Sequence, residues 1–171
     1  AALYCIRSIS KSKVPPGNPH IEGLLLSLPN LPHNPHLLYT SCLTLGAYSG
    51  WLRASLEIGQ GTSVLPALMS VIQVAMRYDE SAAAAAKALS DLCAECDVHL
   101  GSFLQAIVVI YNIAIEPQGR EGQERKHAFE HEDVLEIIKG ISVAVCAFPE
   151  EQLLYGVRCL LEPLIPQMNQ L

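Results

Sequence analysis

Residues 36–53 read HLLYTSCLTLGAYSGWLR, and this stretch decides the fold class. Asn34-Pro35 comes just before it and favours a helix start, because proline suits the first helical turn and keeps the preceding residue out of the helical region. Apolar side chains then recur every three or four residues, at Leu38, Cys42, Leu45, Tyr48, Trp51 and Leu52. This spacing predicts a helix with a wide apolar face, which must be buried against other helices.

The composition of the 171-residue chain agrees with such a helix. Half of the residues are hydrophobic and only 16% are charged, against roughly 25% charged residues in a typical soluble domain. The formal charge of −6 disfavours direct binding to nucleic acid or to an anionic membrane and favours basic partners. No uninterrupted apolar run is long enough to predict a membrane span. We expect an all-helical protein whose helices cover one another on several sides.

Proline, glycine and charge clusters divide the chain into helices that alternate with short breaks. The expected helices cover residues 1–11, 20–28, 36–53, 62–78, 80–97, 102–115, 131–147 and 149–171. Pro163 and Pro166 are expected to kink or break the last helix. The segment 116–130 is the most charged part of the chain and is expected to be an exposed loop. Both ends resemble the interior of a helix, so we expect an internal fragment of a longer chain.

The expected helices form pairs that repeat every 40 to 47 residues or so, which is the period of HEAT and armadillo repeats. One such hairpin cannot bury its apolar face alone, so neighbouring hairpins stack. The prediction is an all-α HEAT-repeat (armadillo-like) α-α superhelix of about three to four helical hairpins. In this prediction residues 1–171 form a single fragment, with pairs at 20–53, 62–97 and 102–147 and partial repeats at 1–11 and 149–171.

Several sequence segments resemble, in the same order, helices of one protein family. They are AALYCIRSIS at the start, YTSCLTLGAYSGWL at 39–52, SVLPALMSVI at 63–72, AKALSDLCAECDVHL at 86–100 and EEQLLYGVRCLLEPLIPQMNQL at 150–171. Together they are similar to the transportin-SR (transportin-3) and importin-13 branch of the importin-β superfamily. The resemblance covers nearly the whole chain except the loop at 116–130.

The resemblance implies a nuclear transport receptor and no enzyme or cofactor. Such a receptor carries protein cargo, including arginine/serine-rich splicing factors, through nuclear pores under Ran-GTP control. Its implied partners are the GTP form of the Ran GTPase, the cargo and Phe-Gly nucleoporins, and it shuttles between cytoplasm and nucleus. Two alternatives remain open at this point: a HEAT-repeat structural scaffold or adaptor for a multi-subunit assembly, and a metal-dependent enzyme that uses the cysteines and histidines.

Candidate partner-binding residues follow from the same resemblance, because second helices of importin-β repeats line the concave side. The acidic residues expected on those helices are Asp91, Glu95, Asp97, Glu132, Asp133 and Glu136. Charge complementarity suits them to a basic cargo. A solvated polar face explains the same residues equally well.

The cysteines and histidines suggest a zinc or redox site that the spacing does not favour. Cys93 and Cys96 with His99 supply three ligands, whereas a structural zinc site needs four. Both cysteines also continue an apolar helix face, so we expect them to pack in the core. His20, His33 and His36 lie among prolines and are expected to be solvated. No Gly-x-Ser-x-Gly elbow or phosphate-binding glycine loop is present, so catalysis is not expected.

Overall fold

The computed structural model describes residues 2–10, 12, 14–115 and 129–165. The charged loop expected at 116–130 lies almost wholly outside these residues, as do residues 166–171 at the end of the expected last helix, 149–171. The α-helices of the described residues are α1 (Ala2–Ile9), α2 (Pro19–Ser27), α3 (Pro35–Glu57), α4 (Val64–Ala75), α5 (Asp79–Cys96), α6 (Leu104–Ile115), α7 (His131–Cys146) and α8 (Glu150–Leu161). Short 3-10 turns cover Leu28–Asn30, Asp97–His99 and Gly101–Phe103.

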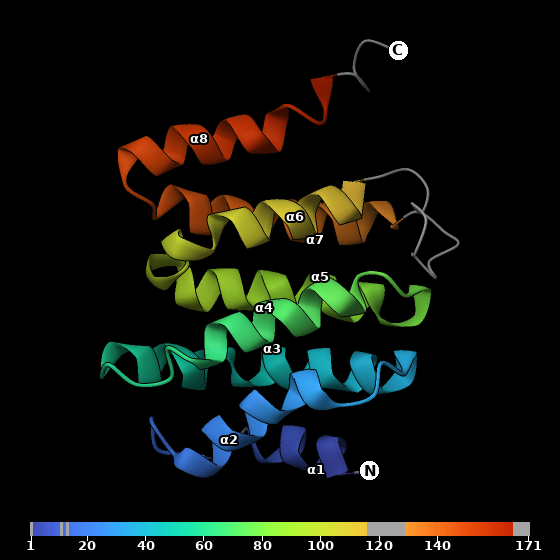
Figure 1. Ribbon diagram of the computed structural model, residues 1–171, viewed down its shortest axis with the longest axis vertical. Helices are drawn as coiled ribbons and strands as arrows, with labels where there is room; N and C mark the ends of the chain where they lie inside the picture. Colours follow the sequence, from blue (N-terminus) through green and yellow to red (C-terminus); the bar gives the residue numbers. More distant parts are fainter. Residues whose placement is uncertain (1, 11, 13, 116–128, 166–171) are drawn as a thin grey trace.

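The helices form two layers of a stack (Figure 1). One layer contains α1, α3, α5 and α7, and we call it the odd layer; the other contains α2, α4, α6 and α8, and we call it the even layer. The chain crosses between the layers after each helix, and α1 and α8 lie at opposite ends of the stack. This is a HEAT-type α-α superhelix, so the predicted fold class is confirmed.

Two helices of one hairpin begin with the same three residues. The side chain of Asn18 accepts hydrogen bonds from the backbone N–H groups of His20 and Ile21, and α2 begins at Pro19. Asn34 does the same for His36 and Leu37 at the start of α3. An Asn cap satisfies N–H groups that have no partner inside the helix, and proline lacks the N–H group that would otherwise stay unpaired. Asn-Pro-His therefore fixes both starts.

The central helix α3 is buried on more sides than its apolar pattern predicts. Ser41, Thr44, Ser49 and Ser55 are buried together with the expected Leu38, Cys42, Leu45, Tyr48 and Leu52. Three of these hydroxyl groups donate to a carbonyl of the preceding turn: Thr44 to Thr40, Ser49 to Gly46 and Ser55 to Trp51. Because a hydroxyl can bond in this way, a small polar side chain fits a covered helix face at little cost.

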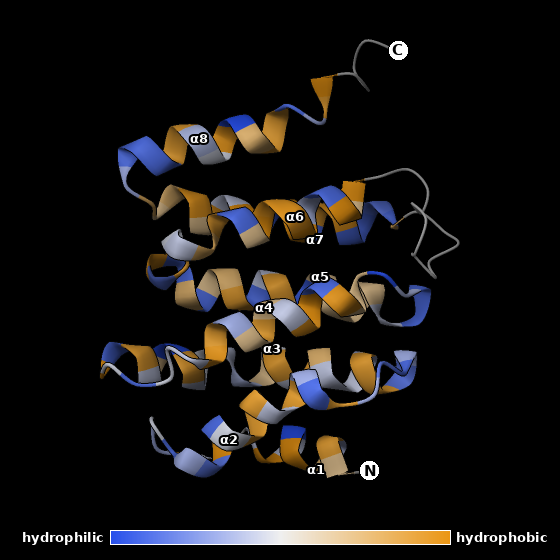
Figure 2. Ribbon diagram, viewed as in Figure 1, coloured by the Kyte–Doolittle hydropathy of each residue, from blue (hydrophilic) through white to orange (hydrophobic). Residues whose placement is uncertain are grey.

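Helices of the odd layer approach one another very closely. A Cβ atom added at Gly140 of α7 would lie 2.6 Å from the Cα atom of Ser90 in α5. The buried side chains of α5 include small alanines, among them Ala84, Ala85 and Ala88, so neighbouring helices can approach its backbone closely. Hydrophobic residues occur on every helix from one end of the stack to the other (Figure 2), and the buried ones form one continuous core.

Two buried tyrosines bind the ends of helices in neighbouring hairpins. The hydroxyl of Tyr48 in α3 donates to the carbonyl of Ile6 near the end of α1, at 2.9 Å. The hydroxyl of Tyr111 in α6 donates to the carbonyl of Leu160 near the end of α8, at 3.0 Å. The last carbonyls of a helix have no partner inside it. Each tyrosine therefore satisfies a carbonyl that the neighbouring helix leaves open.

Trp51 holds the loop that precedes α2. This half-buried side chain packs against the core, and its Nε1–H group donates to the carbonyl of Pro15 at 2.8 Å. The hydroxyl of Ser55 accepts from the backbone N–H group of Gly17, which has a positive φ of 69°. The tryptophan of the family-like segment is thus a packing residue between repeats.

Candidate functional site

The exposed face of the odd layer contains a row of charged side chains that joins three helices. The ammonium group of Lys87 in α5 lies 2.7 Å from a carboxylate oxygen of Asp91 and 3.4 Å from one of Glu136 in α7. The hydroxyl of Ser90 donates to the same oxygen of Glu136 at 2.9 Å. The Ser90 hydrogen bond and the nearby Lys87 and Lys139 lower the pKa of Glu136, and the hydrogen bond to Asp91 raises the pKa of Lys87.

A second charged group joins α3 to α5. The Nε atom of Arg53 lies 2.9 Å from Glu95, and its Nη1 atom lies 3.2 Å from Glu57 one turn further along α3. The hydrogen bond to Glu95 and the charge of Glu57 raise the pKa of the Arg53 guanidinium. All three side chains are about half exposed, so water weakens these pairs. We call the two groups together, Arg53, Glu57, Lys87, Asp91, Glu95 and Glu136, the charge ladder.

The six acidic residues expected to meet a partner do not form one site. Asp91, Glu95 and Glu136 belong to the charge ladder, where each is paired with a cation. Asp97 follows α5, and its carboxylate accepts from the N–H group of Val98. Glu132 and Asp133 lie in the first turn of α7. The helices α5 and α7 run in the same direction (Figure 1). The start of α7, with Glu132 and Asp133, and the end of α5, next to Asp97, therefore lie at opposite edges of the odd layer.

The start of α7 is the most acidic part of the described odd layer. Burial, together with the charges of Glu130 and Glu132, raises the pKa of Asp133. Negative side chains at a helix N-terminus are favoured by the helix dipole. These carboxylates therefore have a local role at the helix start, whether or not a partner binds them.

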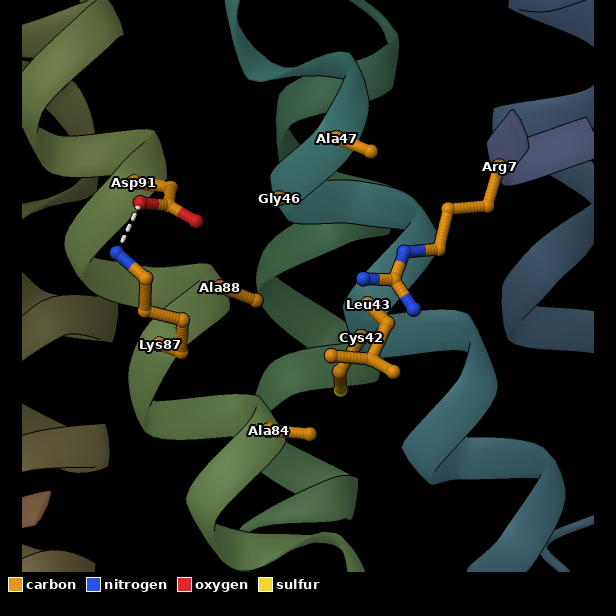
Figure 3. A pocket seen from close by; sticks show the side chains of 9 residues that line it. All are labelled: Arg7, Cys42, Leu43, Gly46, Ala47, Ala84, Lys87, Ala88 and Asp91. Carbon is orange, nitrogen blue, oxygen red and sulfur yellow. Dashed lines mark hydrogen bonds and ion pairs between the residues drawn. The ribbon is translucent and has the colours of Figure 1, made fainter. Parts of the chain in front are cut away.

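A pocket of about 230 Å³ lies over the middle of α3, on the same face as the charge ladder. Figure 3 shows Arg7 of α1 reaching toward it from one side, with Lys87 and Asp91 of α5 on the other. Gly46 and Ala47 of α3 lie between the two sides. A Cβ atom on Gly46 would lie 2.8 Å from Asp91 Oδ2, so glycine keeps the centre of the pocket open.

The cysteines of α5 are core residues. Cys93 and Cys96 have no exposed surface, and burial raises the pKa of both thiols to about 12. The thiol of Cys96 faces the carbonyl of Ser49 in α3 at 3.9 Å. His99 lies after the helix, in the turn Asp97–His99. Within the described residues, no three or more His, Cys, Asp and Glu side chains are grouped as metal ligands.

Sequence reasoning missed the cations of this face. Arg53 with Glu57 and Lys87 with Asp91 have the four-residue spacing of helical ion pairs, so both pairs were visible in the sequence. The links from Arg53 to Glu95 and from Ser90 to Glu136 depend on how far one helix is shifted along its neighbour. No local sequence pattern predicts that shift, and none predicts that Arg7 lies on this face.

The chain is similar to Transportin MOS14 of Arabidopsis thaliana, with 31% identity over 153 residues. The match covers 89% of this chain but 15% of that protein, so the chain spans a small part of the length of its relative. No family model and no solved structure matches the chain. In the described residues, no helix has both the length and the apolar character of a membrane span. This similarity is to a stretch of a transportin and does not distinguish between kinds of transportin.

Proposed function

We propose that this chain is a segment of a nuclear transport receptor of the importin-β family. The observation that carries the proposal is the identity to Transportin MOS14, which extends over nearly the whole chain. The stack of two-helix units agrees with it, because HEAT-type solenoids present long surfaces to protein partners. We propose no catalytic activity and no cofactor for the segment, since the relative is a transport protein by name.

We further propose the transportin-SR and importin-13 branch, on the basis of the T-L-G-A-Y-S-G-W-L run of α3. In this proposal the full protein binds the GTP form of Ran, arginine/serine-rich or other protein cargo, and Phe-Gly nucleoporins. It shuttles between cytoplasm and nucleus through the nuclear pore. Cargo release is then a shift between superhelix conformations that Ran favours unequally.

We also propose that residues 1–171 are one continuous segment of the solenoid, with three complete hairpins and a partial repeat at each end. The complete hairpins correspond to α2 with α3, α4 with α5, and α6 with α7. Helices α1 and α8 are then the described parts of the two partial repeats.

The free energy of binding a basic cargo group should differ among the acidic residues proposed as contacts. A basic partner at Asp91, Glu95 or Glu136 must displace or share Lys87 or Arg53. A partner at Glu132 or Asp133 meets carboxylates that crowd one another, so a basic group there relieves repulsion. We therefore propose the start of α7 as the stronger of the two contact regions, with Asp97 as an isolated contact.

A pull-down with GTP-locked Ran tests the proposal on the full-length protein. We expect capture of the receptor by GTP-locked Ran and not by GDP-bound Ran, together with a cargo that Ran-GTP releases. A stable stoichiometric partner that ignores the nucleotide state of Ran would instead support the scaffold alternative. Absence of both Ran binding and Ran-dependent cargo release would overturn the transport proposal.

A further inference from the structure

The pocket over α3 is lined by one cation, Arg7, whose guanidinium has no direct partner among the described residues. Among the described residues, no hydrogen bond or ion pair involves the side chain of Arg7. The other cation of the pocket, Lys87, is 2.7 Å from Asp91 and 3.4 Å from Glu136. Arg7 is half-buried against a chain with a net charge of −6. The N–H donors of this guanidinium are therefore not used by the described residues.

The floor of the pocket does not compensate the charge. Cys42 lies on the floor and has a thiol that could carry a negative charge. Burial raises the pKa of this thiol to about 12, so the thiol stays neutral. The remaining floor is apolar or small, with Leu43, Ala47 and Ala88. Apolar surroundings strengthen an ion pair formed there relative to one in open water. A carboxylate placed in the pocket thus gains more than on a flat surface.

The walls of the pocket define where a carboxylate can bind. Arg7 and Asp91 stand on opposite sides of Gly46 (Figure 3). Asp91 repels an anion close to α5, whereas the planar guanidinium of Arg7 presents paired N–H donors that match a carboxylate. The volume of about 230 Å³ suits one side chain and not a folded element.

We propose that this pocket receives one glutamate or aspartate side chain of a protein partner, with its carboxylate on Arg7 and its carbon chain over Gly46 and Ala47. The occupant has the opposite charge to the basic cargo groups proposed for the acidic residues. A partner that lies along the odd layer must then combine basic side chains with one acidic residue placed over α3. This pocket is defined by its own chemistry and does not depend on Ran binding.

An NMR titration of the 171-residue chain tests the proposal. The probe is the peptide acetyl-Gly-Glu-Gly-amide, and the signals are Arg7 Nε–Hε and the methyl groups of Leu43, Ala47 and Ala88. We expect saturable shifts confined to these groups, with a dissociation constant on the order of 1 mM. The matching peptide acetyl-Gly-Gln-Gly-amide should bind about tenfold more weakly or worse, because it lacks the charge.

Arginine variants test whether the chemical-shift changes depend on the guanidinium of Arg7. Arg7→Gln should weaken the glutamate peptide about tenfold or more, and Arg7→Lys should weaken it less, since a single ammonium retains the charge without the paired donors. Arg77→Gln removes an exposed arginine outside the pocket and is the matched control, which should bind like the parent chain. Unchanged backbone spectra for each variant show that the fold is intact.

Three results would overturn the proposal. Equal shifts with acetate or inorganic phosphate at the same concentration would mean an adventitious ion only. Equal binding of the glutamine peptide would mean apolar recognition without Arg7. Absence of saturable shifts with the glutamate peptide would mean that the pocket has no such occupant. None of these results bears on capture by GTP-locked Ran, so failure here and failure of the transport proposal are distinguishable.

Discussion

The odd and even layers are built from successive helices of one chain, and they pack in different ways. In the odd layer, α3, α5 and α7 lie so close that Gly140 of α7 meets the backbone of α5 at Ser90. In the even layer, α2, α4, α6 and α8 are shorter and make fewer close backbone approaches. Small residues such as Gly140 thus allow the close packing of the odd layer, and the exposed face of this layer carries the charge ladder.

The largest expected effect is at Gly140. Gly140→Ala places a Cβ atom 2.6 Å from the Cα atom of Ser90, so α5 and α7 must move apart. We expect a loss of about 1–3 kcal/mol or more in the free energy of unfolding, as for other overpacked cores. Thermal and urea unfolding measure it.

Gly23→Ala in α2 is the matched control from the even layer. A Cβ atom at Gly23 meets nothing within 4 Å, so alanine should stabilise the helix by up to about 1 kcal/mol. Equal effects of the two substitutions would contradict the difference between the layers.

The two tyrosines test both layers with one chemical change. Tyr48→Phe leaves the carbonyl of Ile6 without its side-chain donor, and Tyr111→Phe does the same to Leu160. We expect each to cost about 1 kcal/mol in the free energy of unfolding. Amide hydrogen exchange should rise mainly in α1 for the first variant and in α8 for the second. A rise spread evenly over the stack would show that the hydroxyls do not act on these helix ends.

Ser90→Ala tests the polar link between α5 and α7. The hydroxyl of Ser90 is the main cause of the lowered pKa of Glu136, so the substitution should raise that pKa toward its ordinary value. Because the folded pKa is lowered, this contact stabilises the fold above the ordinary glutamate range, and the stability is lost as the pH falls through the folded pKa. Glu136 is partly exposed, so the loss should stay below about 1 kcal/mol.

Carbon-13 NMR of the Glu136 carboxylate measures this pKa directly. Ser142→Ala is the control, since the hydroxyl of Ser142 on the same helix bonds to the carbonyl of Ile138. The control should leave the Glu136 titration unchanged. A Glu136 pKa that is the same in the parent chain and in Ser90→Ala would contradict the assigned hydrogen bond.

The smallest expected effect is the coupling of Arg53 and Glu95. This pair joins α3 to α5 on the surface at 2.9 Å, with both side chains nearly half exposed. A double-mutant cycle with Arg53→Ala and Glu95→Ala should give a small favourable coupling that added salt reduces, because water screens an exposed pair. A coupling of zero would mean that the charge ladder orients side chains without stabilising the odd layer.

The fold was predictable because its signals are local. The spacing of Leu38, Cys42 and Leu45 and the proline at position 35 predict α3, and the repeat of such helices predicts the superhelix. The end of α3 at Glu57 and the burial of its serines were not predictable, since both depend on neighbouring helices. The close approach of Asp91 to Gly46 likewise depends on the neighbouring helix, whereas a Cβ atom added at Gly50 would be only in ordinary contact with Glu95.

The candidate site was less predictable than the fold. Sequence placed Asp91, Glu95 and Glu136 on helices, and the structure adds that Lys87 and Arg53 already pair with them. Whether the six acidic residues contact a partner stays a prediction. The pocket at Arg7 arises from three helices that are distant in sequence, so only the stacked structure shows it.

The close contact between Gly140 and Ser90 has a mechanical consequence. When a stack of two layers bends, the layer that resists compression more strongly changes least in length. The backbones of α5 and α7 are in contact at Gly140 and Ser90, so the odd layer can hardly be compressed there. We therefore expect the stack to bend about α5 and α7, while the helices of the even layer move apart or together. Binding groups on the odd face would then keep nearly fixed distances from one another as the superhelix changes shape.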